Sequence, residues 1–501
     1  MYRFKTGLLF ALLIGQSIAY STVTGYFNGI KTNPNALYAF LKKMPKGGEL
    51  HYHLAGGAYP ETMLALAAQD DYCLDKKTWA ITKTVEHCSG IKARELTQYP
   101  SFYNEAIRAW SMKNFVPGQE SGHDHFFASF NKFMPVIIDY RPALLAEIMQ
   151  RAANQNELYL EIMILPDNAQ STLFSVTQPV IPSNFTAIQQ QLLTNNAFQD
   201  NIQLTIDEAT RILKQARQDL DCEKNNQQAV CELTVKFQYY ILREQPLEKV
   251  FAQALNGFAA ASRSPDIIGV NLVQPEDGII ALRDYDKQMQ IFNFLHQAYP
   301  TVHIALHAGE LAPSDVIPEN LRFHIHNAIH TGQAQRIGHG VAIAFEDNAE
   351  ELLANMAKKQ IAVEINLISN KAILNISGKN HPLTYYLAHK VPVVLSTDDE
   401  GILRTDLTHQ YVDAALNHGV DYPTLKMITR NSLTYSFLAG KSIWADTLKA
   451  IPLSVCQDFN STSCQHFIKE NEKAKLQVQL EKRLASFEEA YIQPFRAKKV
   501  A

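Results

Sequence analysis

Residues 49–53 read Glu-Leu-His-Tyr-His, and residues 391–399 read Val-Pro-Val-Val-Leu-Ser-Thr-Asp-Asp. Side chains alternate between the two faces of a β-strand, so His51 and His53 project to the same side. The second segment is an apolar run that ends in two carboxylates, which are costly to bury unless a metal ion or hydrogen bonds neutralise them. We therefore predict that both histidines and one of these aspartates bind one divalent metal, which requires the first and last strands to be neighbours. Taken alone, the histidines can also line a polar interior, and either aspartate can cap a following helix.

Short β-branched apolar runs recur along the chain, with amphipathic or alanine-rich stretches between them. We expect eight strands, at residues 49–54, 158–164, 234–242, 267–273, 303–307, 336–338, 362–367 and 391–396. Helical stretches between them include residues 142–154, 246–261, 285–298 and 346–359. This alternation predicts an α/β fold, a (β/α)8 TIM-type barrel. A doubly wound open sheet would also fit the alternation, but it would keep the ends of the first and last strands apart.

Two further polar fragments lie at the ends of the fifth and sixth predicted strands, His307-Ala-Gly-Glu310 and Arg336-Ile-Gly-His339-Gly340. Barrels of this type build their active sites at the carboxyl ends of the strands. A lone histidine in an apolar strand is more often a core residue. Here two small residues and then Glu310 follow it, and nearby charges can turn that carboxyl into a proton donor. Three histidines and an aspartate for a metal, with a glutamate, a histidine and a second aspartate for acid–base chemistry, are what a mononuclear zinc hydrolase requires.

The predicted barrel occupies residues 49–440, after a short N-terminal segment at 20–48. Two connections are too long for a minimal barrel. We expect helical, disulfide-containing insertions after strands 1 and 2, at about 55–130 and 165–233, because long connections with their own helices commonly form lids over a site. Residues 441–501 are expected to form a helical extension that ends in a charged amphipathic helix from Ile468 to Tyr491.

Residues 1–19 have the pattern of a cleaved secretory signal peptide. Arg3 and Lys5 precede an apolar run at 7–15, and Ser17-Ile-Ala19 follows it; the run is too short to span a bilayer. The six cysteines fall into three near-neighbour pairs, at 73 and 88, 222 and 231, and 456 and 464. An even count favours three disulfides in an oxidising compartment, although sequence alone permits fifteen connectivities. We therefore expect a secreted or periplasmic protein.

The composition of the 501-residue chain is that of an ordinary soluble globular protein. It has 46% hydrophobic and 19% charged residues and a net charge of −4. This balance gives no reason to expect a nucleic acid partner or, for the mature form, a membrane partner. The sequence leaves the oligomeric state open.

The motifs His-x-His, His-Ala-Gly-Glu, Arg-Ile-Gly-His-Gly and Ser-Thr-Asp-Asp, in this order, resemble the adenosine deaminase family of the amidohydrolase superfamily. Within it the chain looks most like the secreted branch, the adenosine deaminase-related growth factors. Further motifs support that placement: Met44-Pro-Lys-Gly-Gly, His123-Asp-His-Phe-Phe, Phe237-Gln-Tyr, Glu364-Ile-Asn-Leu-Ile-Ser-Asn370 and Asn431-Ser-Leu-Thr-Tyr-Ser-Phe437. The resemblance covers about residues 40–440. It implies one Zn²⁺ per chain and a small-molecule purine nucleoside as substrate.

The resemblance also implies a role for each motif residue. The zinc would be held by His51, His53, His307 and Asp398. Glu310 would protonate the purine nitrogen N1, and His339 would orient and help deprotonate the attacking water. Asp399 would hydrogen-bond the attacking oxygen or the N7 side of the ring. The products would be inosine or 2′-deoxyinosine and ammonia.

Two positions depart from the family pattern. Ala55 replaces a polar residue that helps to hold the sugar, and Gln274 replaces a glycine whose backbone amide contacts the purine. Gln274 still offers its own N–H, and Gly309 leaves room for the substrate. In the first insertion, His125 and Trp110 are further candidate substrate contacts, with a helix-capping and a core role as the respective alternatives.

Other residues are expected to be structural. Arg336 is predicted to form an ion pair at the start of its strand. Phe126 and Phe127 either stack on a purine or form the core of the insertion. A predicted helix carries on its surface His324, His326 and His330.

The leading hypothesis is an exported, zinc-dependent deaminase of adenosine or 2′-deoxyadenosine. Ala55 and Gln274 motivate an alternative, deamination of adenine or of a modified nucleoside. AMP fits less well because no glycine-rich phosphate cradle or arginine cluster marks the mouth of the barrel. A growth-factor-like binding protein on this scaffold is another alternative, although every metal and acid–base residue is present. A binuclear metal hydrolase fits poorly because the fourth strand offers no bridging lysine or carboxylate.

Overall fold

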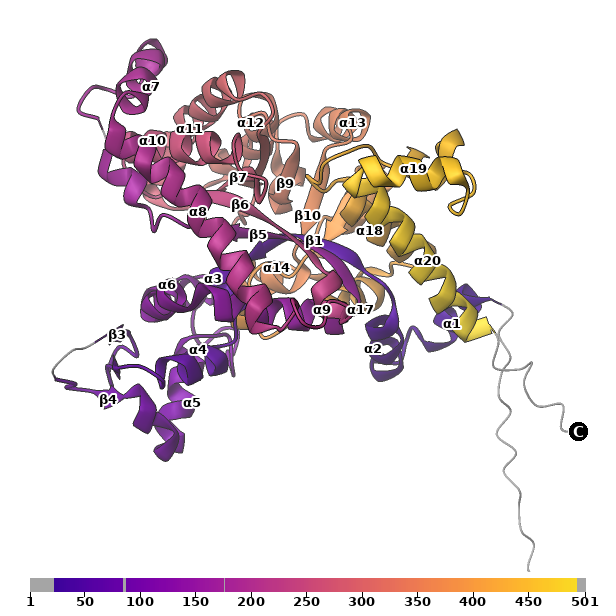
Figure 1. Ribbon diagram of the computed structural model, residues 1–501, viewed down its shortest axis with the longest axis horizontal. Helices are drawn as coiled ribbons and strands as arrows, with labels where there is room; N and C mark the ends of the chain where they lie inside the picture. Colours follow the sequence, from indigo (N-terminus) through magenta and orange to yellow (C-terminus); the bar gives the residue numbers. More distant parts are fainter. Residues whose placement is uncertain (1–21, 84–86, 175, 493–501) are drawn as a thin grey trace, which may run out of the picture.

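Eight parallel strands form a barrel in the computed structural model, which describes residues 22–83, 87–174 and 176–492 (Figure 1). In chain order they are β1 Gly47–His53, β5 Glu157–Ile164, β6 Thr234–Leu242, β7 Ile267–Val273, β8 His303–Ala308, β9 Arg336–His339, β10 Ala362–Ile365 and β11 Val393–Leu395. Each strand pairs with the next one along the chain. The (β/α)8 prediction is confirmed, and the expected strands differ from these only at their ends.

The barrel closes between β1 and the residues that follow β11. A parallel bridge joins Tyr52 to Asp398. The N–H of His53 donates to the carbonyl oxygen of Asp398 at 3.0 Å, and the N–H of Asp398 donates to the carbonyl oxygen of His51 at 3.2 Å. The first and last strands are therefore neighbours, which an open sheet would not allow.

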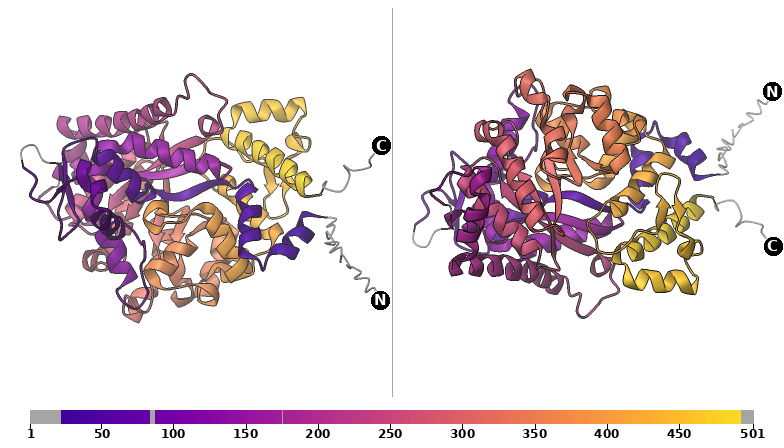
Figure 2. Two further views of the ribbon diagram at one scale, coloured as in Figure 1. Left: turned by 90° about the horizontal axis from the view of Figure 1, so that it is seen from below. Right: turned by 90° about the horizontal axis from the view of Figure 1, so that it is seen from above.

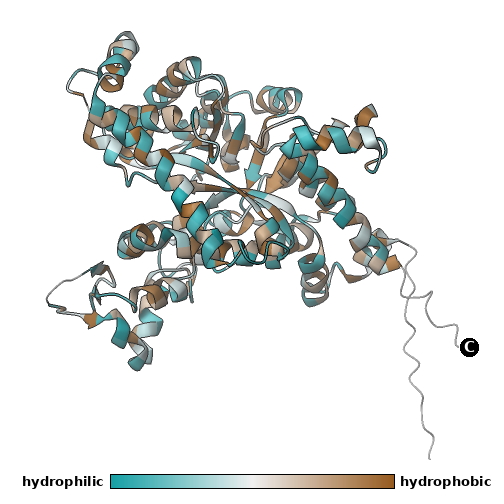
Figure 3. Ribbon diagram, in the orientation of Figure 1, coloured by the Kyte–Doolittle hydropathy of each residue, from teal (hydrophilic) through white to brown (hydrophobic). Residues whose placement is uncertain are grey.

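Helices surround the barrel and bury one side of each strand. The helices that follow β6 and the later strands are α10 Leu247–Ala261, α11 Ile279–Ala298, α12 His324–His330, α13 Ala349–Lys359, α14 Leu367–Leu374, α15 Leu383–Ala388, α16 Glu400–Leu403, α17 Leu407–His418 and α18 Tyr422–Thr434. Strand β5 is buried along its whole length, as expected for a parallel strand between helices and a packed interior. Hydrophilic and hydrophobic residues alternate along the outer helices (Figure 3), so that each presents an apolar stripe to the barrel.

The first long connection contains a small antiparallel sheet and a long helix. Its elements are α3 Leu54–Gly57, α4 Pro60–Ala67, β2 Tyr72–Leu74, β3 Ile81–Lys83, β4 Ile91–Lys92, α5 Pro100–Ala109 and α6 Gly122–Asn154. A disulfide joins Cys73 to Cys88. Helix α6 starts 20 residues before the predicted one, at the N-cap Ser121, and kinks at Tyr140, two residues before Pro142. A proline lacks the N–H of a helical hydrogen bond and restricts the residue before it, which accounts for the kink.

The second connection and both ends of the described chain add further helices. They are α7 Phe185–Leu193, α8 Asn196–Asp219, α9 Ala229–Glu232, α1 Val23–Ile30, α2 Pro34–Lys43, α19 Thr462–Glu470 and α20 Glu472–Ile492, with a hairpin of β12 Trp444–Asp446 and β13 Ile451–Pro452. Disulfides join Cys222 to Cys231 and Cys456 to Cys464. All three near-neighbour pairs are thus present.

The C-terminal extension differs from the prediction in one respect. The single helix expected from Ile468 to Tyr491 is two helices, because Asn471 adopts an extended backbone between them. Its side-chain Oδ1 accepts a hydrogen bond from the N–H of Lys441 at 2.7 Å. Helix α20 lies beside α1 (Figure 2), where the rings of Tyr26 and Tyr491 are 4.9 Å apart.

The expected signal peptide, residues 1–19, lies outside the described residues. Among the helices of the described chain, none is both long enough and apolar enough to cross a membrane.

Candidate active site

Four side chains converge at the carboxyl ends of the strands. His51 and His53 come from the end of β1, His307 from β8, and Asp398 from the loop after β11. Their ligand atoms all lie within 4.8 Å of one another. Oδ1 of Asp398 is 3.3 Å from Nε2 of His51 and 3.2 Å from Nε2 of His53. The structure therefore brings together the whole set of expected metal ligands, which we call the ligand cluster.

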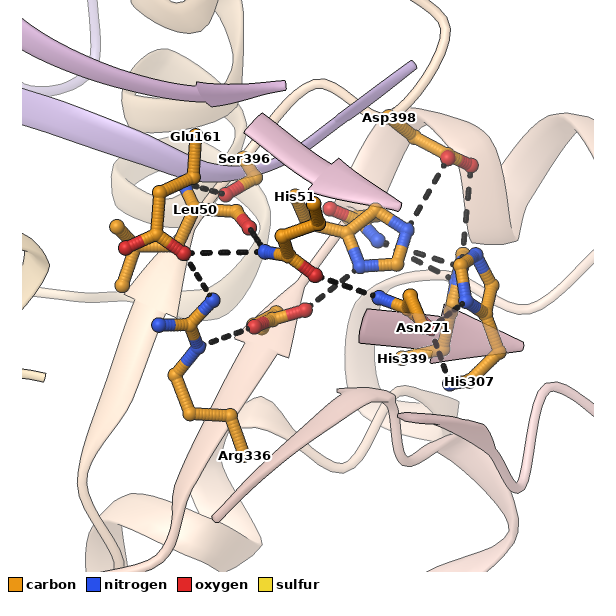
Figure 4. A network of polar contacts seen from close by, with 12 residues as sticks. Leu50, His51, Glu161, Asn271, His307, Arg336, His339, Ser396 and Asp398 are labelled. Atoms are coloured by element: carbon orange, nitrogen blue, oxygen red, sulfur yellow. Dashed lines mark hydrogen bonds and ion pairs between the residues drawn. The ribbon is translucent and has the colours of Figure 1, made fainter. Parts of the chain in front are cut away.

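The two buried imidazoles of the cluster are held by their other nitrogen. Nδ1 of His51 is 2.7 Å from Oε2 of Glu364, and Nδ1 of His307 is 2.9 Å from Oδ1 of Asn271. Both contacts leave Nε2 directed at the centre of the cluster (Figure 4). Nε2 of His51 is buried and has no hydrogen-bond partner. A metal ion supplies what such nitrogens lack, so three imidazoles and one carboxylate fit a single Zn²⁺.

A buried ion-pair network lies beneath the cluster. Arg336 donates from Nε to Oε1 of Glu364 at 2.6 Å and from Nη2 to Glu161, as its predicted ion pair requires. Burial lowers the pKa of His51, but the nearby carboxylates of Asp398 and Glu364 outweigh it and raise that pKa to about 10. The carboxylates around His51 thus stabilise a positive charge at the ligand cluster, either a proton on the imidazole or a bound metal cation.

Glycines give two of these groups the space they occupy. A Cβ at Gly338 would lie 2.7 Å from Cε1 of His51, and one at Gly56 would lie within the carboxylate of Asp399. Both contacts are shorter than any side chain tolerates. The first explains the glycine in Arg-Ile-Gly-His-Gly, and the second explains the one that follows Ala55.

Three acid–base groups surround the cluster. Burial raises the pKa of Glu310 well above its usual value, and the charges of Asp398 and Glu276 raise it further. Burial and Asp398 raise the pKa of Asp399 likewise, and Oδ1 of Asp399 is buried without a hydrogen-bond partner. Nδ1 of His339 lies 3.5 Å from Oε1 of Glu310. A neutral Glu310 is suited to donate a proton.

The backbone is strained where two of these groups are presented. His339 has φ 66° and Asp398 has φ 67°. Residues with a side chain seldom adopt this left-handed region, and where they do, the strain tends to mark functional sites. The strain at Asp398 is offset in part by the hydroxyl of Ser369, which donates to its Oδ2 at 2.7 Å.

A cavity of about 450 Å³ opens onto the cluster. Its polar lining includes His53, Glu310, Asp398 and Asp399. Helix α6 covers it with Phe126, Phe127, Phe130 and Met134, and other apolar lining comes from Ala55, Leu165, Leu242 and Val273. A volume of this size, mostly apolar with a few convergent polar groups, is typical of a small-molecule site.

Comparison with known proteins places this site in a family. The sequence model of the family described as adenosine deaminase matches residues 113–445, more than half of the chain. The chain belongs to the adenosine deaminase family. It is 38% identical over 138 residues to an adenosine deaminase of Klebsiella pneumoniae (strain 342), an alignment that covers 27% of this chain and 38% of that relative. The chain thus spans well under two thirds of the length of the curated relative it matches.

Solved structures share the fold at low sequence identity. An adenine deaminase from Arthrobacter aurescens has a TM-score of 0.54 at 16% identity, over 88% of this chain and 99% of that one. An amidohydrolase from Burkholderia ambifaria with bound zinc has a TM-score of 0.51 at 15% identity, over 90% and 94%. Both likenesses concern the barrel architecture.

Gln274 lies where the resemblance places a glycine, and its backbone conformation explains why a glycine suits this position. It has φ 83°, a conformation that favours glycine. Its side-chain oxygen Oε1 is engaged by the backbone, because it accepts a hydrogen bond from the N–H of Glu244 at 2.9 Å. Gln274 lines the cavity and remains a candidate contact through its backbone.

Three other candidate contacts are not among the residues that line the cavity. Trp110 is fully buried, with Nε1 donating to the carbonyl of Trp79 at 2.7 Å, so it is core of the insertion. Nε2 of His125 lies 3.0 Å from the carbonyl oxygen of Ser111, which ties α6 to the preceding loop. The N–H of Gly309 donates to Glu276 and is not free for a substrate. Phe126 and Phe127, by contrast, do reach the cavity.

Glu276 is a site residue that the sequence did not reveal. Its carboxylate accepts from the N–H of Gly309 at 3.0 Å and of Glu310 at 2.8 Å, and it lies 2.6 Å from Nδ1 of His324. The expectation that His324 lies on a helix surface is wrong, because it is buried as the partner of this carboxylate. The available signal was an acid two residues after Gln274, too common in loops to be specific.

Proposed function

We propose that this chain is a zinc-dependent hydrolase that deaminates adenosine or 2′-deoxyadenosine to the corresponding inosine and ammonia. The observation that carries the proposal is the meeting, in one cavity, of the ligand cluster with Glu310 and Asp399. Membership of the adenosine deaminase family supports it. The apolar side chains that line the cavity support it too, because they can pack against the faces of a purine ring.

We assign the zinc to His51, His53, His307 and Asp398. When bound, zinc makes a water molecule nucleophilic near neutral pH. Glu310, kept protonated by burial, donates its proton to N1 of the ring, so that C6 becomes electrophilic. Asp399 accepts a hydrogen bond from the attacking water, with His339 orienting it. As water adds at C6, one of its protons would pass through Asp399 to the amino group. The C–N bond then breaks and ammonia leaves, while the proton of the C6 hydroxyl returns to Glu310 and the 6-oxo purine remains.

The cavity favours an uncharged substrate over a phosphorylated one. Among the described residues that line it there is no lysine or arginine, whereas Glu310, Asp398 and Asp399 are all acids. A phosphate would be repelled by the acids and would find no guanidinium partner. A nucleoside or a free base is therefore the better substrate than AMP.

A second candidate is deamination of adenine or a modified aminopurine. The side chain of Ala55 lines the cavity and offers no hydrogen bond to a sugar, and phenylalanines of α6 line the same cavity. This lining favours aminopurines that carry, in place of a ribose, only a hydrogen or a small or apolar group. The chemistry at C6 would be unchanged.

We further propose that the protein acts in an oxidising compartment, secreted or periplasmic. The three disulfides, which close loops within single segments, support this location.

The test is a spectrophotometric assay of the purified chain beginning at Tyr20, with adenosine, 2′-deoxyadenosine, adenine and AMP, and with zinc measured in the same sample. We expect turnover of a nucleoside with about one zinc per chain. Glu310→Gln should retain zinc and lose about 10²- to 10⁴-fold in kcat. Turnover of adenine alone would favour the second candidate function, deamination of adenine or a modified aminopurine. Bound zinc without turnover of any of the four would overturn the proposal.

A further inference from the structure

A buried row of hydrogen bonds leads from a backbone amide to His339. The N–H of Leu383, at the start of α15, lies 3.1 Å from Nδ1 of His381. Nε2 of His381 lies 3.0 Å from Oδ1 of Asn370, and Nδ2 of Asn370, on α14, lies 2.8 Å from Nδ1 of His339. Both linking side chains are buried. The proposed reaction gives His381 no part.

The direction of each bond in this row is fixed by its first member. A backbone N–H can only donate, so Nδ1 of His381 must accept. Burial, reinforced by the neighbouring His418, lowers the pKa of His381 to about 3, which keeps the ring neutral. A neutral imidazole that accepts at Nδ1 carries its hydrogen on Nε2, and this hydrogen is donated to Oδ1 of Asn370.

The hydrogen bond from His381 also fixes the orientation of the Asn370 side-chain amide. With Oδ1 occupied by His381, its amide nitrogen faces His339 and can only donate. Nδ1 of His339 is therefore an acceptor, and the hydrogen of the neutral ring lies on Nε2. The amide nitrogen of Asn366 lies 3.4 Å from each ring nitrogen and therefore does not distinguish the two tautomers. A hydrogen on Nδ1 would face the donor of Asn370 at 2.8 Å, whereas the carboxyl oxygen Oε1 of Glu310 lies farther from Nδ1, at 3.5 Å.

Nε2 is the nitrogen of His339 that faces the ligand cluster. It lies 3.9 Å from Oδ2 of Asp398, and the ring of His51 lies edge-on at 4.8 Å. We propose that His381 is a positioning residue which, through Asn370, holds His339 as the Nε2–H tautomer. His339 then donates a hydrogen bond at the reacting centre, and acceptance of the water's proton is left to Asp399. The catalytic consequence rests on the proposed function, whereas the tautomer follows from the hydrogen bonds alone.

The decisive readout is the tautomer of His339 in the zinc-loaded protein. Imidazole ¹⁵N spectra of histidine-labelled protein distinguish Nδ1–H from Nε2–H, and the missing signal in His339→Gln assigns the residue. We expect Nε2–H in the wild type. Asn370→Asp, of the same shape, places an acceptor beside Nδ1 and should move the hydrogen there. A wild-type Nδ1–H tautomer would overturn the proposal, whether or not any aminopurine is turned over.

Kinetics supply the second arm on whichever aminopurine the enzyme turns over. A wrong imidazole tautomer in an otherwise intact site costs up to about 10⁴-fold in kcat in a well-studied hydrolase. We expect Asn370→Asp to lose about 10²-fold or more in kcat, with KM and zinc content near those of wild type. His381→Phe removes both hydrogen bonds and should lose about 10- to 100-fold. His381→Gln keeps a donor and should recover most of that loss.

His418 provides the packing control. Its ring lies edge-on to His381 at 5.5 Å, so His418→Phe disturbs the same buried contact without touching the row of hydrogen bonds. We expect it to keep the wild-type kcat and tautomer. If His381→Phe folds, binds zinc and also keeps both, His381 does not position His339. If His418→Phe lowers kcat as far as His381→Phe does, packing explains the effect and the proposal fails.

Discussion

Nδ1 of His51 lies 2.7 Å from Oε2 of Glu364, and Oε1 of the same carboxylate accepts a hydrogen bond from Arg336 at 2.6 Å. All three side chains are buried. The guanidinium keeps the pKa of Glu364 below its usual value in spite of burial, so the carboxylate faces His51 as an anion. An imidazole that donates to an anion from Nδ1 is a stronger metal ligand through Nε2.

Glu364→Gln should therefore weaken zinc binding by about 10- to 100-fold. The amide has the same shape but lacks the charge that makes His51 basic. Competition with a chromogenic chelator measures the affinity. Unfolding by denaturant, followed on the apo protein, separates metal loss from loss of stability.

The chain offers a matched control on its surface. His389 and Glu350 form a histidine–carboxylate pair of similar length, 2.8 Å, in an exposed position. Glu350→Gln should leave the zinc affinity unchanged. Equal affinities for wild type and Glu364→Gln would show that the charge of Glu364 does not tune the ligand.

The fold was predictable because its evidence lies within short segments. Each strand is an apolar run such as Ile267–Val273, and its period and length can be read without knowing its neighbours. Barrel closure followed from one long-range requirement, that His51 and His53 share a metal with an aspartate more than 300 residues later. Boundaries that depend on tertiary contacts were less accurate, as Asn471 shows by dividing the predicted C-terminal helix.

The metal ligands were predictable for the same reason, because each lies in a motif at a strand end. Supporting residues were not. Glu276 and His381 act through partners 33 to 48 residues and 11 residues away in sequence, respectively, and neither has a spacing that marks it. Trp110 shows the converse error, since an aromatic residue in a lid segment suggests a stacking surface whether it faces the cavity or the core.

A second prediction concerns the attachment of the lid helix α6 to the barrel. Nε2 of His123 lies 3.0 Å from Oδ1 of Asp277, three residues after Gln274. Burial opposes the charge of His123, but hydrogen bonds to Asp277 and Asp124 raise its pKa to about 9. A raised histidine pKa stabilises the fold fully below the unfolded value of 6.5 and loses that stabilisation as pH rises through 9.

Stability should thus fall by about 1 to 3 kcal/mol between pH 6 and pH 9.5 through this group, since solvent screens part of the interaction. His123→Gln and Asp277→Asn should each flatten the dependence, since either change removes the pair. Denaturant titrations at the two pH values measure the difference. A wild-type slope preserved in both variants would assign the effect to other groups.

The strained backbone at Gln274 gives a third prediction. Its φ of 83° favours glycine, while its side chain compensates by accepting from the N–H of Glu244. Gln274→Ala keeps the strain and loses the hydrogen bond, whereas Gln274→Gly loses the bond but relieves the strain. The glycine variant should be more stable than the alanine variant by about 1 to 2 kcal/mol.

Gln333 is the matched control for this comparison. It also has a left-handed backbone, with φ 61°, but it does not line the cavity. Both positions should prefer glycine over alanine in thermal or denaturant unfolding. A change in KM for the aminopurine should accompany substitution at 274 alone. Equal stability of Gln274→Ala and Gln274→Gly would mean that the backbone relaxes when the side chain is removed.

The fourth prediction separates the two candidate substrates through Ala55. This residue lies in α3 at the cavity wall, where the resemblance places a polar group against the sugar. Ala55→Asp restores a charged acceptor there. A hydrogen bond to a charged group contributes about 1.5 to 3 kcal/mol, so kcat/KM for adenosine should rise by about tenfold or more.

The value of kcat/KM for adenine, which has no sugar, should not rise with Ala55→Asp. Ala55→Val adds a similar volume without an acceptor and should raise neither. A rise for both substrates with Ala55→Asp would mean that the carboxylate acts on the ring rather than on the sugar, and would leave the preference for nucleoside over base unexplained by this position.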